Sequence, residues 1–215
     1  MEKELAIRFA RSKANESIYN LSKFEHLNMT FPETETILAG ITLDYVDKEE
    51  ALIIINLKRA WTLILNKNFK ELNIDFLKEI NMIIAKDIAV FPGEFRNTPS
   101  NVAGVNHNIN PLSEKEIISK FETLNKMEDK IEMIIELIPF LITNQLFWDG
   151  NKRTAFVFAN SILIALGIGV LTIPESKYIE FAYALNNFYN KDSEENKILL
   201  SYLLREQIQR VPKND

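Results

Sequence analysis

The 215-residue chain contains no cysteine, only six glycines and seven prolines, and two histidines. Without cysteine, it forms no disulfide and no thiolate metal site, and it has no thiol nucleophile. The low glycine and proline content disfavours sandwiches and barrels and favours a helical globule. Hydrophobic residues make up 47% of the chain, which is enough for a sizeable core. We therefore expect an all-α fold in a single domain over residues 1–215.

Excess charge and long apolar spans are also scarce. The formal net charge of −5 argues against a broad nucleic-acid-binding surface, although it leaves room for a small basic pocket. The chain begins with the charged segment Met1–Glu4, so no signal peptide is visible. The longest apolar run, Phe156–Leu171, contains Asn160 and Ser161 and is read as a core helix. We expect a cytoplasmic protein without nucleic-acid or membrane partners.

Helical periodicity covers most of the chain. Asp47 with Glu50 and Ser113 with Glu116 resemble capping boxes, and Asn73 is a further capping residue. The expected helices cover residues 2–19, 34–38, 51–65, 74–84, 114–124, 131–142, 151–166, 175–189 and 193–208.

Residues 91–111 break this periodicity. They contain three prolines and two glycines among many asparagines, which predicts a long loop with a small β-hairpin near Val102–Val105. Long loops in compact domains are often functional, and an ordinary surface loop is the alternative.

The most informative segment is 147–153, which joins two strongly apolar helices. Gly150 has no side chain to block a ligand from the backbone, and Asn151 is expected to cap the following helix. The first N–H groups of that helix lie at the positive end of its dipole. Lys152 and Arg153 add two cations, so this segment is predicted to bind the phosphates of a nucleotide.

Asp149 lies beside this predicted anion site. A carboxylate next to a phosphate is repulsive unless a cation lies between them, and Mg²⁺ commonly bridges the two. The segment therefore predicts a nucleotide–Mg²⁺ site. In the alternative interpretation, Asp149 caps the helix while Lys152 and Arg153 are solvated.

Residues 147–153 resemble the core motif of the Fic (filamentation induced by cyclic AMP) family, His-x-Phe-x-(Asp/Glu)-Gly-Asn-x-Arg. The segment 93–96 followed by 102–105 is similar to the family's upstream region, which ends in a β-hairpin flap. Residues 166–168 and 173–175 are also similar. The match covers about residues 30–190, and it implies a Fic-like helical bundle with a small β-hairpin flap.

The resemblance implies transfer of AMP from ATP to a hydroxyl of a target protein. Asp149 would then hold Mg²⁺, while Gly150 and Asn151 would line the anion hole. Arg153 would contact the terminal phosphates, and Phe147 would anchor the loop in the core. The flap residues would align a target segment by strand addition; these are Val102, Ala103, Gly104 and Val105.

The chain departs from the motif at its first position, where Gln145 replaces the catalytic histidine. An imidazole accepts a proton near neutral pH, whereas an amide only orients a hydroxyl by hydrogen bonding. The possible substitutes are His107, just past the flap, and Asp149, whose basicity Mg²⁺ would reduce. An exposed loop position is the alternative for His107. His26 shows no functional pattern.

A second departure concerns inhibition. Many family members pair a second motif arginine with a glutamate of an inhibitory helix. The corresponding positions here are Phe156 and, in the segment 35–40, Ala39. We therefore expect this form of autoinhibition to be absent.

Three functions remain open from the sequence. One is a nucleotide-binding protein with impaired AMP transfer, another is an active transferase with an unusual base or donor, and the third is a helical interaction module without a ligand. Oligomeric state does not follow from the sequence.

Overall fold

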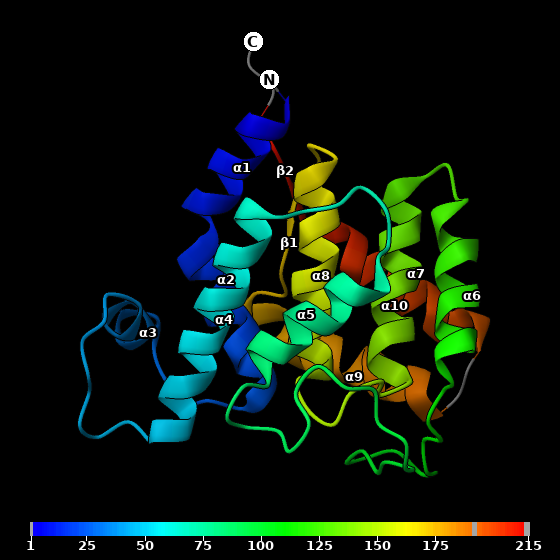
Figure 1. Cartoon of the computed structure of the whole chain (residues 1–215), viewed down its shortest axis with the longest axis horizontal. Helices are drawn as coiled ribbons and strands as arrows, with labels where there is room; N and C mark the ends of the chain where they lie inside the picture. The colour runs from blue at the N-terminus through cyan, green and yellow to red at the C-terminus, as the bar shows by residue number, and fades with distance from the viewer. Residues whose placement is uncertain (1, 191–192, 213–215) are drawn as a thin grey trace.

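The computed structural model describes residues 2–190 and 193–212, and it is mostly helical (Figure 1). The all-α fold class expected from the sequence is confirmed. The helices are α1 (Glu2–Ser12), α2 (Ala14–Ser22), α3 (Phe31–Leu38), α4 (Lys48–Asn66), α5 (Ile74–Ile84), α6 (Glu114–Asn125), α7 (Lys130–Thr143), α8 (Asn151–Ala165), α9 (Tyr178–Asn190) and α10 (Glu194–Glu206). Two short 3₁₀ turns, η1 (Lys23–Glu25) and η2 (Glu175–Lys177), and the strands β1 (Gly169–Leu171) and β2 (Ile208–Arg210) complete the described elements.

Helix α8 forms the centre of the fold. Every residue in it except Lys152 is buried, and it packs against α7, α5, α4 and β1. A helix that is apolar on all sides is either a core helix or a membrane span. Within the described residues, no helix is long and apolar enough to cross a membrane. Residues 151–165 are therefore the core helix that the sequence predicts.

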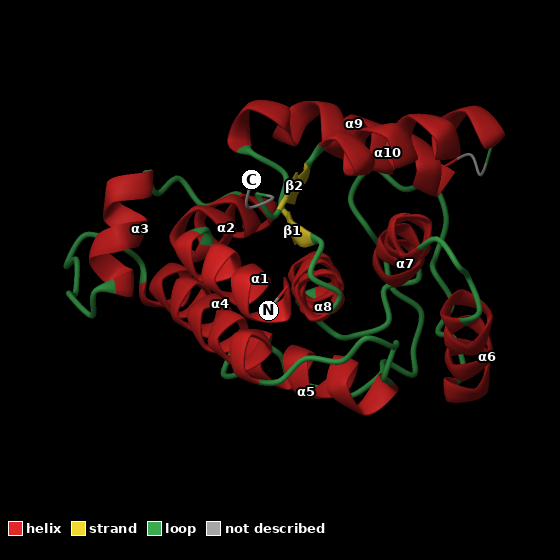
Figure 2. Cartoon of the chain, turned by 90° about the horizontal axis from the view of Figure 1, so that it is seen from above, coloured by secondary structure: helices red, strands yellow, loops and turns green. Residues whose placement is uncertain are grey.

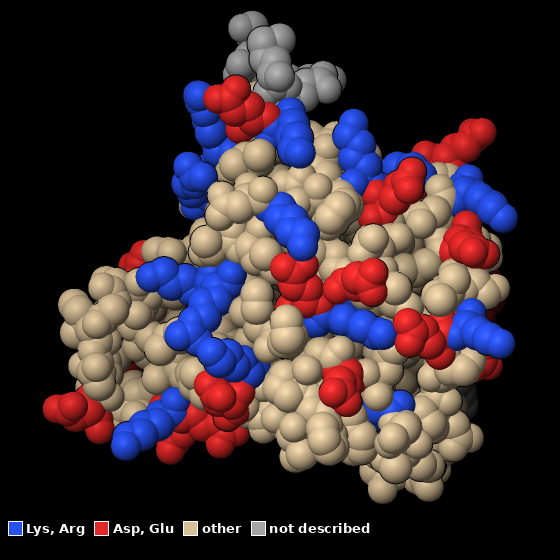
Figure 3. Space-filling model, viewed as in Figure 1, with Lys and Arg blue, Asp and Glu red and all other residues tan. Residues whose placement is uncertain are grey.

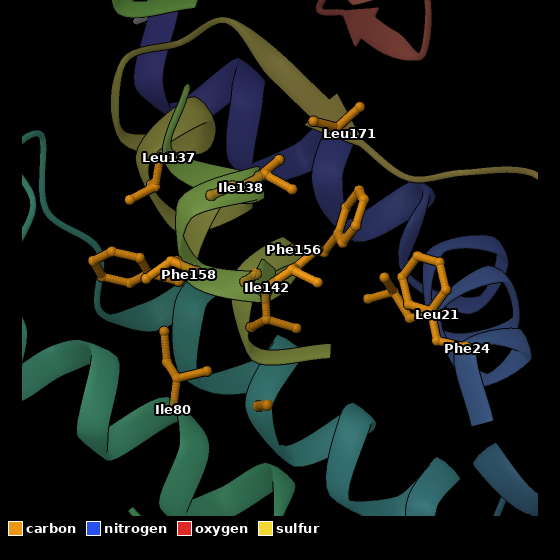
Figure 4. Close-up of a cluster of buried hydrophobic side chains, with 14 of the residues drawn as sticks. Leu21, Phe24, Ile80, Leu137, Ile138, Ile142, Phe156, Phe158 and Leu171 are labelled. Atoms are coloured by element: carbon orange, nitrogen blue, oxygen red, sulfur yellow. The ribbon is translucent and has the colours of Figure 1, made fainter. Parts of the chain in front are cut away.

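The other helices surround α8 on several sides. In Figure 2, α9 and α10 form one outer layer, α5 lies on the opposite side, and α3 and α6 occupy the two flanks. Figure 4 shows the aromatic rings of α8 pointing into different parts of the core. The Phe156 ring lies 5.0 Å from that of Phe24, and the Phe158 ring lies 5.9 Å from that of Phe121.

Side-chain caps define where several helices begin. Ser113 forms the expected capping box with Glu116, and Asn73 caps α5 by accepting a hydrogen bond from Phe76 N. Asp47 accepts from the nearer Glu49 N. A further capping box at Thr30 starts α3 three residues before the expected first residue, Thr34. The expected cap at Asn151 is wrong, because Gly150 is the capping position of α8.

Two features of the fold differ from the expectation. The first expected helix, 2–19, is divided at Lys13 into α1 and α2. A short antiparallel sheet, which the sequence analysis did not predict, pairs Gly169–Leu171 with Ile208–Arg210. Each strand has only three residues, and the two strands lie far apart in the sequence. No local sequence pattern therefore predicts their pairing.

Surface charge is mixed on the face shown in Figure 3, where lysine and arginine side chains are interspersed with aspartate and glutamate. This face has no broad basic surface of the kind that binds nucleic acid.

We predict that Asn160→Ala destabilises the protein by about 2–3 kcal/mol, because buried backbone groups lose their partners. Asn160 Oδ1 accepts from Leu171 N at 2.7 Å, and Nδ2 donates to Leu171 O at 2.7 Å. Urea unfolding measures the loss. Asn66→Ala is the control, because Asn66 is exposed and makes one hydrogen bond to Thr62 O. Equal destabilisation by both substitutions would contradict this role of Asn160.

Candidate functional site

Asn81 of α5 attaches the loop between α7 and α8 to the rest of the fold. Its Nδ2 donates to Asp149 O at 2.9 Å and to Thr154 Oγ1 at 3.0 Å. Its Oδ1 accepts from Gly93 N at 2.9 Å. Sequence reasoning missed Asn81; its only signal is a polar residue between apolar positions of the inner face of α5. The buried Asn81 amide therefore positions both the predicted anion loop (147–153) and the start of the long loop (91–111).

Arg96 fixes the other end of the same loop. The segments meet in an antiparallel bridge between Phe95 and Phe147, and Arg96 N donates to Leu146 O at 2.9 Å. The buried guanidinium donates to the backbone oxygens of residues 144 and 145 at the end of α7 and of residues 98 and 110 at the base of the flap. Burial lowers the pKa of Arg96 from its ordinary value. As expected, Phe147 is buried.

The start of α8 has the geometry of an anion site. Gly150 has φ +73° and no side-chain cap, and the first N–H bonded within the helix is that of Thr154. The N–H groups of residues 151–153 have no hydrogen-bond partner among the described residues. A Cβ at Gly150 would lie 2.9 Å from Ile84 Cγ2, so α5 occupies the space where a ligand was expected. The free donors of α8 remain at the positive end of its dipole.

Arg153 is the charged group at the centre of this site. Its side chain is 1% exposed and lies between two carboxylates, with Nε 2.7 Å from Glu25 Oε1 and Nη2 3.2 Å from Asp149 Oδ2. Its Nη1 is buried and has no hydrogen-bond partner among the described residues. A buried guanidinium with an unpaired nitrogen is a strong receptor for a further anionic oxygen.

Glu25 comes from the turn η1, and the sequence analysis did not single it out. The Phe24 ring packs on Phe156, the position where the resemblance would place a second arginine. This packing brings Glu25 to Arg153. Phe156 is a core side chain and Ala39 is exposed, and the absence of the inhibitory pairing stays a prediction. The Glu25 carboxylate nevertheless contacts Arg153 of the anion loop, and no pattern in the sequence pointed to Glu25.

The Gln145 side chain makes three hydrogen bonds within the protein. Its Nε2 donates to Ile142 O at 3.0 Å and to Tyr189 Oη at 2.6 Å. Its Oε1 accepts from Asn151 Nδ2 at 3.0 Å, and Asn151 Oδ1 accepts from Phe147 N at 2.8 Å. Burial raises the pKa of Tyr189 to about 12. Both donors of the Gln145 amide are engaged, so this side chain holds the loop in shape.

Lys152 points toward a small cavity beside the loop. The cavity has a volume of about 220 Å³ and is lined by aromatic rings of η1 and α9 and by the flap residues Val102 and Ala103. Lys152 Nζ donates to Phe24 O at 3.3 Å. Burial lowers the pKa of Lys152, and the nearby Glu25 carboxylate opposes that effect. Lys152 is therefore part of the start of α8 and also part of the cavity wall.

The flap is a loop closed by one antiparallel bridge between Ser100 and Ile109, which agrees with the small hairpin that the sequence predicts. Its tip contains a turn in which Val105 N donates to Val102 O. Asn190 of α9 fastens the tip by donating to Gly104 O at 2.8 Å and accepting from Asn106 N at 2.9 Å. The flap thus lies against α9, over the small cavity.

The two histidines lie in different surroundings. His107 is exposed and lines a second, larger cavity together with Asn144 and Tyr189. His26 has a left-handed φ of 58° and lines the small cavity, where its ring makes an edge contact with Tyr178. Neither histidine has a described hydrogen bond to Gln145 or Asp149.

We predict that Asn81→Ala loosens the anion loop, because Asp149 O, Thr154 Oγ1 and Gly93 N all lose a partner. Hydrogen exchange at the amides of residues 146–151 is expected to accelerate. Asn125→Ala is the control, because Asn125 holds Leu72 N and O at a distant loop. The role assigned to Asn81 is wrong if both variants lose stability but neither changes exchange in this loop.

Comparison with known proteins agrees with this geometry. Residues 71–163 match the Fic/DOC family model. No curated protein gives a significant match. The fold is similar to that of Fic-1 from C. elegans, with a TM-score of 0.76 at 18% sequence identity over 95% of this chain and 62% of that chain. The chain thus spans less than two thirds of Fic-1.

Two bacterial structures are similarly close in fold. A Fic domain containing signaling protein from Bacteroides thetaiotaomicron has a TM-score of 0.74 at 17% identity, over 95% of this chain and 85% of that one. A Fic family protein from Desulfovibrio desulfuricans has a TM-score of 0.71 at 13% identity, over 96% of this chain and 66% of that one. Residues 71–163 therefore resemble the Fic/DOC family in sequence, and the chain around them has a fold similar to that of Fic proteins of known structure.

Proposed function

We propose that the chain binds the phosphates of a nucleotide, with Mg²⁺, at the start of α8, and that it transfers AMP poorly because Gln145 replaces the proton acceptor. The observation that carries this proposal is the Arg153 guanidinium. It is buried beside the open N–H groups of α8, and its Nη1 lacks a partner among the described residues. Most buried side-chain nitrogens have a hydrogen-bond partner, so an unpaired Nη1 is unusual for a purely structural arginine.

Phosphate oxygens would accept hydrogen bonds from the first N–H groups of α8 and from Arg153. Lys152 would add charge from the side of the small cavity, which it lines. The Asn151 amide is turned toward Phe147 and Gln145, so its side chain shapes the loop and its backbone N–H faces the anion. These contacts combine a helix dipole with two cations, which is a common way of binding phosphate.

Asp149 is the residue that would hold Mg²⁺. Its side chain is 35% exposed, so water and phosphate have access to it. The described residues contain no cluster of three metal-ligating side chains. This fits Mg²⁺ that is bound by one carboxylate, nucleotide phosphates and water. The ion would neutralise charge between Asp149 and the phosphates.

The small cavity offers a place for the nucleoside. It lies between the flap tip and α9, and Phe24, Tyr178 and Phe181 provide aromatic surface for a flat base. Asn186 supplies an amide for the polar edge of the base. Lys152, the second residue of α8, also lines this cavity. The flap residues 102–105 would then contact both the nucleotide and a target protein whose segment adds along the flap.

Gln145 limits the chemistry of this site. An amide has no basicity near neutral pH, and its hydrogen bonds to Ile142, Tyr189 and Asn151 leave it no free donor to orient a hydroxyl. General-base catalysis contributes about 10²–10⁴-fold to a reaction of this kind. AMP transfer is therefore expected to be slower by that factor than with a histidine at this position.

An active transferase is the second candidate, and one observation favours it. Burial lowers the pKa of Lys152, which lines the cavity proposed for the nucleoside. Only a neutral amine accepts a proton, and a lowered pKa increases the neutral fraction of a lysine. In that case Lys152 would take the proton of the acceptor hydroxyl.

We predict that Glu25→Gln increases the affinity for ATP with Mg²⁺ by about tenfold, because Glu25 competes with phosphate for Arg153. Calorimetry on the full chain measures the affinity. Glu175→Gln is the control, because Glu175 pairs with Lys23 at 3.4 Å and does not face Arg153.

Removing the charge of Arg153 with Arg153→Gln is expected to abolish binding, and a melting curve verifies that this variant folds.

The proposal fails if the unaltered protein and Glu25→Gln both show no binding at millimolar ATP. It also fails if a folded Arg153→Gln variant binds as well as the unaltered chain. In either case the helical interaction module becomes the better description of the chain.

We predict that Gln145→His raises AMP transfer by about 10²–10⁴-fold, because it restores a proton acceptor beside the phosphate site. Incubation with α-labelled ATP and a cell lysate measures transfer to protein. Gln145→Asn is the control, because it disturbs the same hydrogen bonds without adding a base. Strong labelling by the unaltered chain that is lost in Lys152→Gln would instead support the second candidate.

A further inference from the structure

A second cavity lies beside the one proposed for the nucleoside. Its volume is about 660 Å³, and it is bounded by the second arm of the flap (107–112), by α6 and α7, and by the facing ends of α9 and α10. Tyr189 lines both cavities and separates them. The Tyr189 hydroxyl is held by Ile142 O at 2.7 Å, so this wall is fixed. None of the residues of the anion loop, 147–153, lines the second cavity.

The floor of this cavity is apolar. Ile135, Pro139 and Phe140 of α7 form one side, and Leu200 of α10 and Phe188 of α9 form the other. A floor of this composition binds an apolar side chain by removing it from water.

The rim of the cavity is polar and carries more positive than negative charge. Lys120 and Lys197 line it against a single carboxylate, Glu136. Glu136 is already paired with Lys120 at 3.4 Å, whereas Lys197 is exposed and has no described partner. In a chain with a net charge of −5, this local excess of cations favours an acidic ligand.

The flap arm adds a third feature, an unpaired backbone edge. Ile109 exchanges both backbone hydrogen bonds with Ser100. In an antiparallel pair, the backbone groups of the next residue point to the opposite side. Asn108, which lines the cavity, has no backbone hydrogen bond among the described residues. An open edge of this kind suits an extended peptide better than a compact small molecule.

We propose that this cavity is a docking site for an extended segment of a partner protein, in which an apolar side chain is followed by an acidic one. The apolar side chain lies on the floor between Phe140 and Leu200, and the acidic one faces Lys197. Asn108 offers backbone hydrogen bonds to the segment. Binding at this site does not depend on nucleotide binding at α8, so each proposal is tested without the other.

The test uses a fluorescein-labelled synthetic peptide with a Leu-Glu-Leu-Glu core between Gly-Ser flanks, and anisotropy is recorded with the full chain in the absence of nucleotide. Saturable binding is expected, and Lys197→Glu is expected to weaken it by about five- to tenfold through charge reversal. Lys126→Glu is the matched control, because Lys126 is an exposed lysine outside the cavity. Ser201→Trp, which places an indole in the cavity, is expected to abolish binding.

Two control peptides test the chemistry of recognition. A Leu-Lys-Leu-Lys core is expected to bind at least tenfold more weakly than the acidic peptide, and a Ser-Glu-Ser-Glu core is expected not to bind. The proposal is overturned if the basic core binds as well as the acidic one, or if Lys197→Glu and Lys126→Glu have equal effects. The proposal is also overturned if no peptide binds and the cavity instead binds octanoate, provided that Ser201→Trp abolishes the octanoate binding. That result would identify a small-molecule site. Self-association of the chain through this cavity, abolished by Ser201→Trp, would likewise overturn the proposal. If Ser201→Trp fails to fold, Lys197→Glu at its exposed position decides the outcome.

Discussion

The buried guanidinium of Arg153 is the interaction on which the site depends. It lies between Glu25 and Asp149, and it therefore links the turn after α2, the loop before α8 and α8 itself. A buried charge is tolerated only where opposite charges and hydrogen bonds surround it. The two carboxylates meet that requirement incompletely, because Nη1 has no described partner. The same residue thus links these three segments and has one guanidinium nitrogen without a described partner.

Neutral side chains hold the rest of the loop in place. Asn81 and Asn151 bond to backbone groups of the loop, while Gln145 bonds to the Asn151 side chain and to Ile142 O in α7. The guanidinium of Arg96 satisfies carbonyls at the end of α7. Irregular backbone is buried here, and each buried N–H and C=O needs a partner. This network explains why Gln145 is compatible with an intact loop. It also explains why the Gln145 amide has no free N–H for a reacting hydroxyl.

Tyr189 divides the surroundings of the loop into two regions with different chemistry. On one side, the small cavity contains aromatic surface and Lys152, which suits a nucleoside attached to phosphates. On the other side, the larger cavity combines an apolar floor with Lys197 and an unpaired backbone edge, which suits a peptide. The flap borders both regions, since Val102 and Ala103 line the first and Ile109 lines the second. A chain with impaired transfer chemistry would still be able to bind a nucleotide and a protein at neighbouring sites.

The sequence by itself determined the helical class, most helix positions and the place of the loop before α8, because periodicity, capping residues and a short motif are local properties. Tertiary structure decided the partners of that loop. The pairing of Glu25 with Arg153 spans 128 residues, and that of Asn81 with Thr154 spans 73. No spacing rule connects such positions, since they meet only when α5, η1 and α8 pack around the same core. The cap of α8 shows the same limit: Asn151 is a good capping residue by type, yet its amide is taken by Phe147 and Gln145, and Gly150 takes the cap because its backbone is left-handed.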